Sequence, residues 1–189
     1  CLSCAHQDGV EVSGMPTLKT NVFLVGIMGV GKTTIARRLA RMLGVAAVDV
    51  DSYMRNMYHR DSSHLFKDMG EEKFRACEVH ALAACADLGP AIVSCSEGAV
   101  ATSEGRRILT ERGFAIFLDS SCDGAMKRIR SLRTRPLLAQ GGDAHSIMDA
   151  RRPMLEEVAC ACVDVEGLST TEACARVTAV LKGRGIYVK

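Results

Sequence analysis

The sequence predicts an α/β fold, a three-layer sandwich in which helices cover both faces of a five-stranded parallel sheet. Five short apolar runs are each followed by helical periodicity, and they lie near residues 21–26, 46–50, 91–95, 114–118 and 162–165. The runs at 46–50 and 91–95 are apolar almost throughout, which is typical of parallel strands buried on both faces. Strands joined through helices in this way have right-handed crossovers.

The composition is that of one globular domain. The chain has 189 residues, of which 48% are hydrophobic and 24% charged, and its formal net charge is +2. A chain of this length buries about 70% of its unfolded surface in a single core. The small net charge gives no general argument for a nucleic-acid partner, and no apolar run is long enough to span a membrane. We therefore expect a cytoplasmic monomer that binds neither nucleic acid nor membrane.

A glycine-rich segment from Gly26 to Thr33 follows the first predicted strand and has the pattern G-x-x-x-x-G-K-T. Glycines let the backbone curl so that successive N–H groups point inward at a helix N-terminus, where they bind phosphate. Lys32 would reach the outer phosphates, and the Thr33 hydroxyl would be a ligand of a Mg²⁺ ion that bridges two phosphates. The alternative is a strand-to-helix turn that binds no ligand. The predicted nucleotide-binding residues of this segment are Gly29, Val30, Gly31, Lys32, Thr33 and Thr34.

Two aspartates end the second predicted strand, at the edge of the sheet where open α/β folds bind their ligands. Alternation along the strand sends the side chains of Asp49 and Asp51 to the same side. One carboxylate, assigned to Asp49, can hold Mg²⁺ directly or through water, and the other, Asp51, can face an acceptor hydroxyl. The alternative is that Asp51, which precedes Ser52, only caps the next helix.

Two segments interrupt the alternation of strands and helices. Residues 51–88 contain more helix than one crossover requires, and we expect them to form a substrate-binding platform. Residues 133–146 are polar and contain two adjacent glycines, which predicts a mobile lid.

Five basic residues lie between Lys127 and Arg135, where the lid begins. Beside a nucleotide, a guanidinium group there would stabilise the charge on a transferring γ-phosphoryl group, and Arg135 is the strongest candidate. The alternative is a solvated helix end favoured by the helix dipole. Arg75 and Arg151 are candidates only in context, because each on its own could be a surface residue.

Taken in order, these residues resemble those of shikimate kinases over residues 21 to about 182. The resemblance implies a P-loop kinase core with substrate-binding helices and a lid. It also implies transfer of the ATP γ-phosphate, with Mg²⁺, to the 3-hydroxyl of shikimate, a small-molecule acceptor in aromatic amino-acid biosynthesis. The matching segments are the phosphate loop, Asp49-x-Asp51, Gly70-Glu71-x-x-Phe74-Arg75-x-x-Glu78, Gly98-Ala99-Val100, Arg135-Pro136-Leu137-Leu138 and Arg151-x-Pro153.

On the acceptor side, the resemblance implies that Asp51 binds the acceptor hydroxyls near the departing proton. Arg75 and Arg151 would pair with the shikimate carboxylate, a planar anion suited to guanidinium groups. Glu78 would orient Arg75, and Gly98 would lie against the substrate.

On the nucleotide side, the resemblance implies that Arg135 contacts the ATP phosphates and the transition state. Arg128 would stack near the adenine. Together with Asp51, the residues Lys32 and Arg135 form the predicted catalytic set.

The chain departs from the family pattern in two places. Where the family has three glycines after the third strand, this chain has Ser96-Glu97-Gly98. If Glu97 points inward, about 4–5 Å from a bound carboxylate, the repulsion opposes binding by about 1–4 kcal/mol. A Glu97 side chain that turns away, or that pairs with a lid arginine, would remove that penalty. In addition, residues 163–168 lack the arginine that often covers the adenine, so we expect weaker adenine binding.

We expect residues 1–20 to form a flexible N-terminal extension, residues 21–182 a single kinase domain and residues 183–189 a C-terminal tail. Two alternatives remain open. One is a related P-loop kinase for another hydroxylated acid such as gluconate, which Glu97 would favour if it reshapes the pocket. The other is a nucleotide-binding module without phosphoryl transfer, which would have no use for an acceptor-side acid such as Asp51.

Overall fold

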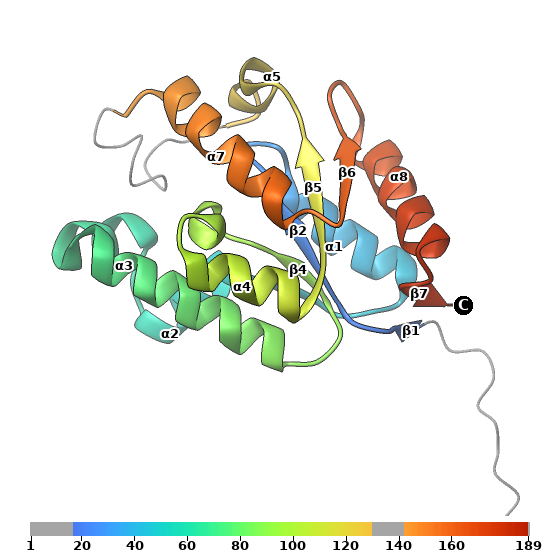
Figure 1. Ribbon diagram of the computed structural model, residues 1–189, viewed down its shortest axis with the longest axis horizontal. Helices are drawn as coiled ribbons and strands as arrows, with labels where there is room; N and C mark the ends of the chain where they lie inside the picture. The colour runs from blue at the N-terminus through green and yellow to red at the C-terminus, as the bar shows by residue number, and fades with distance from the viewer. Residues whose placement is uncertain (1–16, 130–141, 189) are drawn as a thin grey trace, which may run out of the picture.

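The computed structural model describes residues 17–129 and 142–188, and at its centre lies a parallel sheet of five strands (Figure 1). The strands lie in the order β3-β4-β2-β5-β6. Strand β2 is therefore the central strand, with β4 and β3 on one side of it and β5 and β6 on the other. This confirms the predicted fold class and all five predicted strands. Their bounds are Asn21–Val25 for β2, Ala47–Asp49 for β3, Ile92–Ser94 for β4, Gly113–Asp119 for β5 and Ala161–Asp164 for β6.

Helices cover both faces of the sheet. Helices α1 and α8 pack together on one face, while α3, α4 and α7 lie together on the other (Figure 1). The segment predicted as a substrate-binding platform forms two helices, α2 and α3, and α3 is interrupted at Gly70, whose φ of 78° is not helical. The bounds are Lys32–Leu43 for α1, Val50–Tyr58 for α2, Ser62–Asp87 for α3, Glu97–Val100 for the 3-10 helix η1, Ser103–Glu111 for α4, Cys122–Met126 for α5, Ala144–Val158 for α7 and Thr170–Gly183 for α8.

Strand β2 lies at the centre of the core, and all five of its residues are buried. Strand β4 is buried as predicted, but the prediction that the run at 46–50 is buried on both faces is wrong. Strand β3 is the edge of the sheet, so it has one neighbouring strand, and Ala47 is exposed. The apolar run therefore predicts a strand, but it does not predict whether that strand lies at the centre or at the edge of the sheet.

Two very short strands join the ends of the fold. Strand β1, Thr17–Leu18, pairs antiparallel with β7, Tyr187–Val188, and the Tyr187 hydroxyl donates to the Leu43 carbonyl oxygen at 3.3 Å. Residues 17–18 were assigned to a flexible extension and residues 187–188 to a tail, and for these four positions the assignment is wrong. The side chains of Leu18 and Tyr187 are buried, and this packing is what holds both ends.

The predicted lid, residues 133–146, falls mostly outside the described residues. Its last part is described and leads into α7, where the Asp143 carboxylate caps the helix by accepting from the Ser146 N–H at 2.8 Å. Within the part of the chain that the structure describes, no helix is both long and apolar enough to cross a membrane.

Candidate active site

The glycine-rich loop joins β2 to the N-terminus of α1, as predicted. Gly29 has a φ of 79°, which L side chains rarely adopt, and a Cβ atom there would lie 2.2 Å from the Ala125 carbonyl oxygen. Only glycine fits this position, because the loop backbone passes directly against α5. The loop therefore presents backbone N–H groups at the start of α1, where the helix dipole favours an anion.

The two residues predicted to hold a metal ion, Thr33 at the start of α1 and Asp49 at the end of β3, lie together, next to Ser94 at the end of β4. The Thr33 hydroxyl donates to the Asp49 carboxylate at 2.7 Å and lies 3.2 Å from the Ser94 hydroxyl. These are hard oxygen donors of the kind that Mg²⁺ prefers, so the residues fit this metal. Burial acts to raise the pKa of Asp49, but hydrogen bonds from Thr33 and Ser52 outweigh it and hold that pKa below its usual value. Asp49 is thus kept ionised beside the loop.

Lys32 lies over the same loop. Its Nζ donates to the carbonyl oxygens of Gly26 at 2.8 Å and of Ile27 at 3.1 Å. The ammonium group is therefore held against the phosphate loop itself.

Asp51 lies in the first turn of α2, on the acceptor side of Asp49. The pKa of Asp51 is raised to about 6, first by burial and then by the negative charges of Asp49, Glu78 and Glu97, against the opposing effect of Lys32. Asp51 thus lies within electrostatic reach of both the phosphate loop and the two glutamates. A carboxylate with a pKa near 6 can accept a proton from a reacting hydroxyl at neutral pH.

Arg75 and Glu78 form an almost fully buried pair on α3. The Arg75 Nη1 lies 2.6 Å from the Glu78 carboxylate, and the two side chains are 11% and 5% exposed. Burial raises the pKa of Glu78 in spite of this pairing. In the described part of the chain, the buried Arg75 Nε has no hydrogen-bond partner. The structure thus places Glu78 in contact with Arg75, and that Glu78 orients Arg75 for a ligand stays a prediction.

Gly98 lies directly against this pair. A Cβ atom on Gly98 would be 1.8 Å from the Glu78 Oε2 and 2.3 Å from the Arg75 Nη1. The close approach of η1 to the buried ion pair therefore requires glycine here, which gives a physical reason for the part of the family's glycine motif that this chain keeps.

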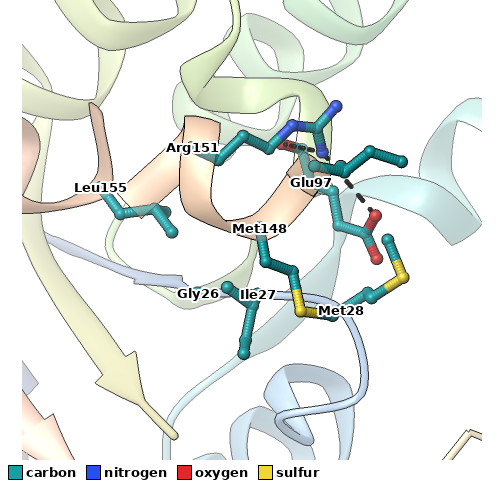
Figure 2. Close-up of a pocket in the computed structure, with 8 residues that line it drawn as sticks. Gly26, Ile27, Met28, Glu97, Met148, Arg151 and Leu155 are labelled. Atoms are coloured by element: carbon teal, nitrogen blue, oxygen red, sulfur yellow. Dashed lines mark hydrogen bonds and ion pairs between the residues drawn. The ribbon is translucent and has the colours of Figure 1, made fainter. Parts of the chain in front are cut away.

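Arg151 reaches from α7 to Glu97 at the start of η1 (Figure 2). Its Nη1 donates to the Glu97 carbonyl oxygen at 3.1 Å and lies 3.8 Å from the Glu97 carboxylate. Burial lowers the pKa of Arg151, an effect that the Glu97 charge opposes. Arg151, the arginine predicted to bind the acceptor carboxylate, is thus a partner of Glu97 within the part of the chain that the structure describes. Residues 130–141 lie outside that part, so the pairing of Glu97 with an arginine of the lid stays a prediction.

A small pocket lies between the phosphate loop and α7 (Figure 2). Its volume is about 10 Å³, which is the room that one water molecule needs. Glu97 and Arg151 form its polar wall, and apolar side chains form the rest. The lining residues are Gly26, Ile27, Met28, Glu97, Ile147, Met148, Arg151 and Leu155.

The predicted nucleotide clamp is only partly within the described residues. Arg128, after α5, donates from Nη1 to the Val30 carbonyl oxygen at 3.4 Å, which places it beside the phosphate loop. Arg135 lies outside the described residues.

Sequence reasoning missed an ion pair that ties α7 to the sheet. Arg152 Nη2 lies 2.6 Å from the Asp119 carboxylate at the end of β5, and the guanidinium carbon lies 5.6 Å from the centre of the Phe117 ring. Asp119 is the last residue of its strand, as Asp49 is of β3, so both carboxylates lie at the carboxyl ends of the parallel strands. That position in the sequence pattern could have identified Asp119 as a candidate.

Comparisons with known proteins show which family the chain is similar to. A family model described as shikimate kinase matches residues 28–182. The chain is 37% identical to the shikimate kinase of Bordetella avium over 153 residues, which are 79% of this chain and 73% of that protein. It is 33% identical to that of Pasteurella multocida over 165 residues, covering 85% and 91% of the two chains.

Solved structures give the same result. A shikimate kinase from Acinetobacter baumannii in complex with shikimate has a TM-score of 0.81 and 25% identity, over 87% of this chain and 94% of that one. A gluconokinase from Sinorhizobium meliloti has a TM-score of 0.55 and 20% identity over 88% and 98%, which shows the fold alone. The family model covers more than half of the chain, and both relatives compared by sequence are more than 30% identical over more than two thirds of it, so the chain belongs to the shikimate kinase family.

Proposed function

We propose that the chain transfers the γ-phosphoryl group of ATP to the 3-hydroxyl of shikimate. The observation that carries this proposal is the position of Asp51. Its pKa is lowered by the charge of Lys32 on the phosphate side and raised by the charge of Glu78 on the acceptor side. An acid placed between a phosphate loop and an arginine site is what phosphoryl transfer to a hydroxylated acid requires.

On the donor side, backbone N–H groups from Gly29 to Thr34 bind the ATP phosphates. Thr33 and Asp49 would hold Mg²⁺, which would supply positive charge at the phosphate oxygens. Lys32 adds a fixed positive charge at the outer phosphates. Support for these roles comes from the 2.7 Å contact between Thr33 and Asp49 and from the position of Lys32 over the loop.

On the acceptor side, Arg75 and Arg151 bind the carboxylate and Gly98 lies against the ring. The 3-hydroxyl oxygen attacks the γ-phosphorus, the bond from that phosphorus to the β,γ-bridging oxygen breaks, and ADP leaves. Asp51 accepts the hydroxyl proton. Support comes from the buried Arg75 Nε, which has no hydrogen-bond partner among the described residues and can donate to the acceptor. The Acinetobacter structure shows that a similar fold binds shikimate.

Arg128 and Arg135 complete the donor site in this proposal. Arg128 lies beside Val30 of the loop, from which it can reach the nucleotide base. Arg135 would contact the transferring phosphoryl group, with residues 133–146 acting as a lid that excludes water.

A coupled assay of ADP release tests the proposed function. The purified chain is given ATP and Mg²⁺ with shikimate, with gluconate, or with no acceptor. We expect rapid release with shikimate and only background release in the other two reactions. Release that depends on gluconate instead would keep the chemistry and change the acceptor. Release independent of any acceptor would reduce the function to ATP hydrolysis.

A further inference from the structure

We propose that Glu97 is an internal competitor for the acceptor carboxylate, and that it makes this site discriminate against acidic acceptors. The inference rests on the proposed function, because it concerns the same acceptor site. It starts from the position of one carboxylate, which lies against the arginine that the acceptor needs (Figure 2).

Arg151 makes two contacts with Glu97, one with its backbone and one with its side chain. Its Nη1 contacts both the carbonyl oxygen of Glu97, at 3.1 Å, and the carboxylate of Glu97, at 3.8 Å. The two side chains are only 14% and 16% exposed, so solvent screens their attraction less than at a surface. An acceptor carboxylate that approaches Arg151 must therefore share this guanidinium with Glu97 or displace it.

The backbone of Glu97 cannot easily move away. Gly98 follows immediately and is packed so closely on Glu78 that a single added carbon would overlap the carboxylate. Ala99 and Val100, which complete η1, are buried in the core. Relief must therefore come from rotation of the Glu97 side chain, which would separate its charge from Arg151.

Each arginine of the site thus has an internal counter-ion. Arg75 is paired with Glu78, and Arg151 with Glu97. A bound acceptor carboxylate adds a negative charge beside two positive charges, each of which already lies against a glutamate. If residue 97 were neutral, one of these positive charges would be left for the acceptor. Glu97 therefore lowers the affinity for an acidic acceptor relative to a neutral one of the same shape.

The experiment compares two acceptors that differ in one charge, shikimate and its uncharged methyl ester. Binding of each to the parent chain and to Glu97→Gln is measured by isothermal titration calorimetry. Glutamine keeps the size of the side chain and removes its charge. We expect Glu97→Gln to bind shikimate about tenfold more tightly than the parent, while the affinity for methyl shikimate changes by less than about twofold.

Three further variants make the comparison specific. Glu97→Asp keeps the charge, and we expect no gain in shikimate affinity. Glu97→Gly removes both the charge and the side chain, so it tests the same inference if the glutamine variant does not fold. Glu157→Gln is the matched control, because Glu157, on α7, also pairs with an arginine, Arg106 at 3.4 Å, but is 63% exposed outside the pocket.

The inference is overturned if neutral residue 97 leaves the affinity for shikimate unchanged. It is also overturned if the affinity for the methyl ester rises in parallel, because the effect would then be one of shape. Failure of the proposed function has a different signature. Shikimate would then bind with the expected difference between parent and Glu97→Gln, but neither protein would release ADP in its presence.

Discussion

The Glu78 carboxylate lies 2.6 Å from the Arg75 guanidinium in a place that is almost closed to solvent. Breaking one side of a buried pair leaves an uncompensated charge, which costs about 3–5 kcal/mol. The pair is therefore a structural element of the acceptor site as well as a means of orienting Arg75. Its tight packing against η1 leads to the first prediction.

Gly98→Ala should destabilise the protein and weaken acceptor binding together. The added Cβ would lie 1.8 Å from the Glu78 carboxylate, so the ion pair must shift, and overpacking of this kind costs about 1–3 kcal/mol. The free energy of unfolding, from urea titration, and the KM for shikimate are the measurements. Gly183→Ala is the control, because nothing lies within 4 Å of its added carbon. Equal stability of the two variants would contradict the packing described for Gly98.

Lys32→Ala should lower kcat by at least about 10²–10³-fold and leave the fold intact, because the ammonium group serves the phosphates and does not pack in the core. Steady-state ADP release measures the rate, and circular dichroism checks the fold. Arg37→Ala removes a positive charge from the exposed face of the same helix, and we expect it to be neutral. Near-normal turnover of Lys32→Ala would argue against the phosphate-loop assignment.

Arg75→Ala and Arg151→Ala should each raise the KM for shikimate far more than the KM for ATP. Each variant removes a charge-assisted hydrogen bond worth about 1.5–3 kcal/mol, which corresponds to about a 10- to 150-fold change. Arg184→Ala, an exposed position after α8, provides the comparison. If both KM values for shikimate stayed at the parent value, the acceptor would have to bind elsewhere.

Asp51 should make the stability of the protein fall as the pH rises from about 4 to about 6. Its pKa is about 6 in the fold and 3.8 in the unfolded chain, so in this window the folded state binds a proton that the unfolded state does not. Ionising Asp51 in the folded state then costs up to about 3 kcal/mol. Asp51→Asn should match the parent near pH 4 and be more stable at pH 7, measured by denaturant unfolding without nucleotide or metal.

The same residue predicts the activity profile. Because Asp51 must be ionised to accept a proton, kcat/KM for shikimate should rise through a pH near 6. Asp51→Asn should abolish turnover, whereas Asp149→Asn, an exposed position on α7, should keep it. A stability difference that stays constant from pH 4 to pH 7 would show that Asp51 has an ordinary pKa.

The sequence predicted the elements that depend on local pattern. Apolar runs located all five strands of the sheet, and the glycine spacing located the loop, because both follow from neighbouring residues. It missed β1 and β7, since a strand of two residues has no period to detect. The edge position of β3 also escaped, because pairing order is a property of the whole sheet.

In the candidate site, too, the sequence predicted the residues that belong to motifs but not the contacts between residues far apart in the chain. The ordered motifs identified Asp51, Arg75 and Arg151, but no motif indicated that Glu97 would pair with Arg151, which is 54 residues away. That contact exists because α7 packs beside η1, and only the assembled layers bring the two together. The pairing of Arg152 with Asp119 was missed for the same reason.

The pairing of Thr17 with Val188 has a practical consequence for engineering. Both strands lie near the end of the sheet where β2 begins, whereas the phosphate loop and the acceptor residues lie where the strands end (Figure 1). A short linker from residue 188 to residue 17 would close the described fold into a ring. New termini could then be opened at the turn around Gly89, next to the exposed Leu88, without cutting any strand. Such a circular permutant would keep its catalytic edge continuous and carry any fused partner on the opposite side of the molecule.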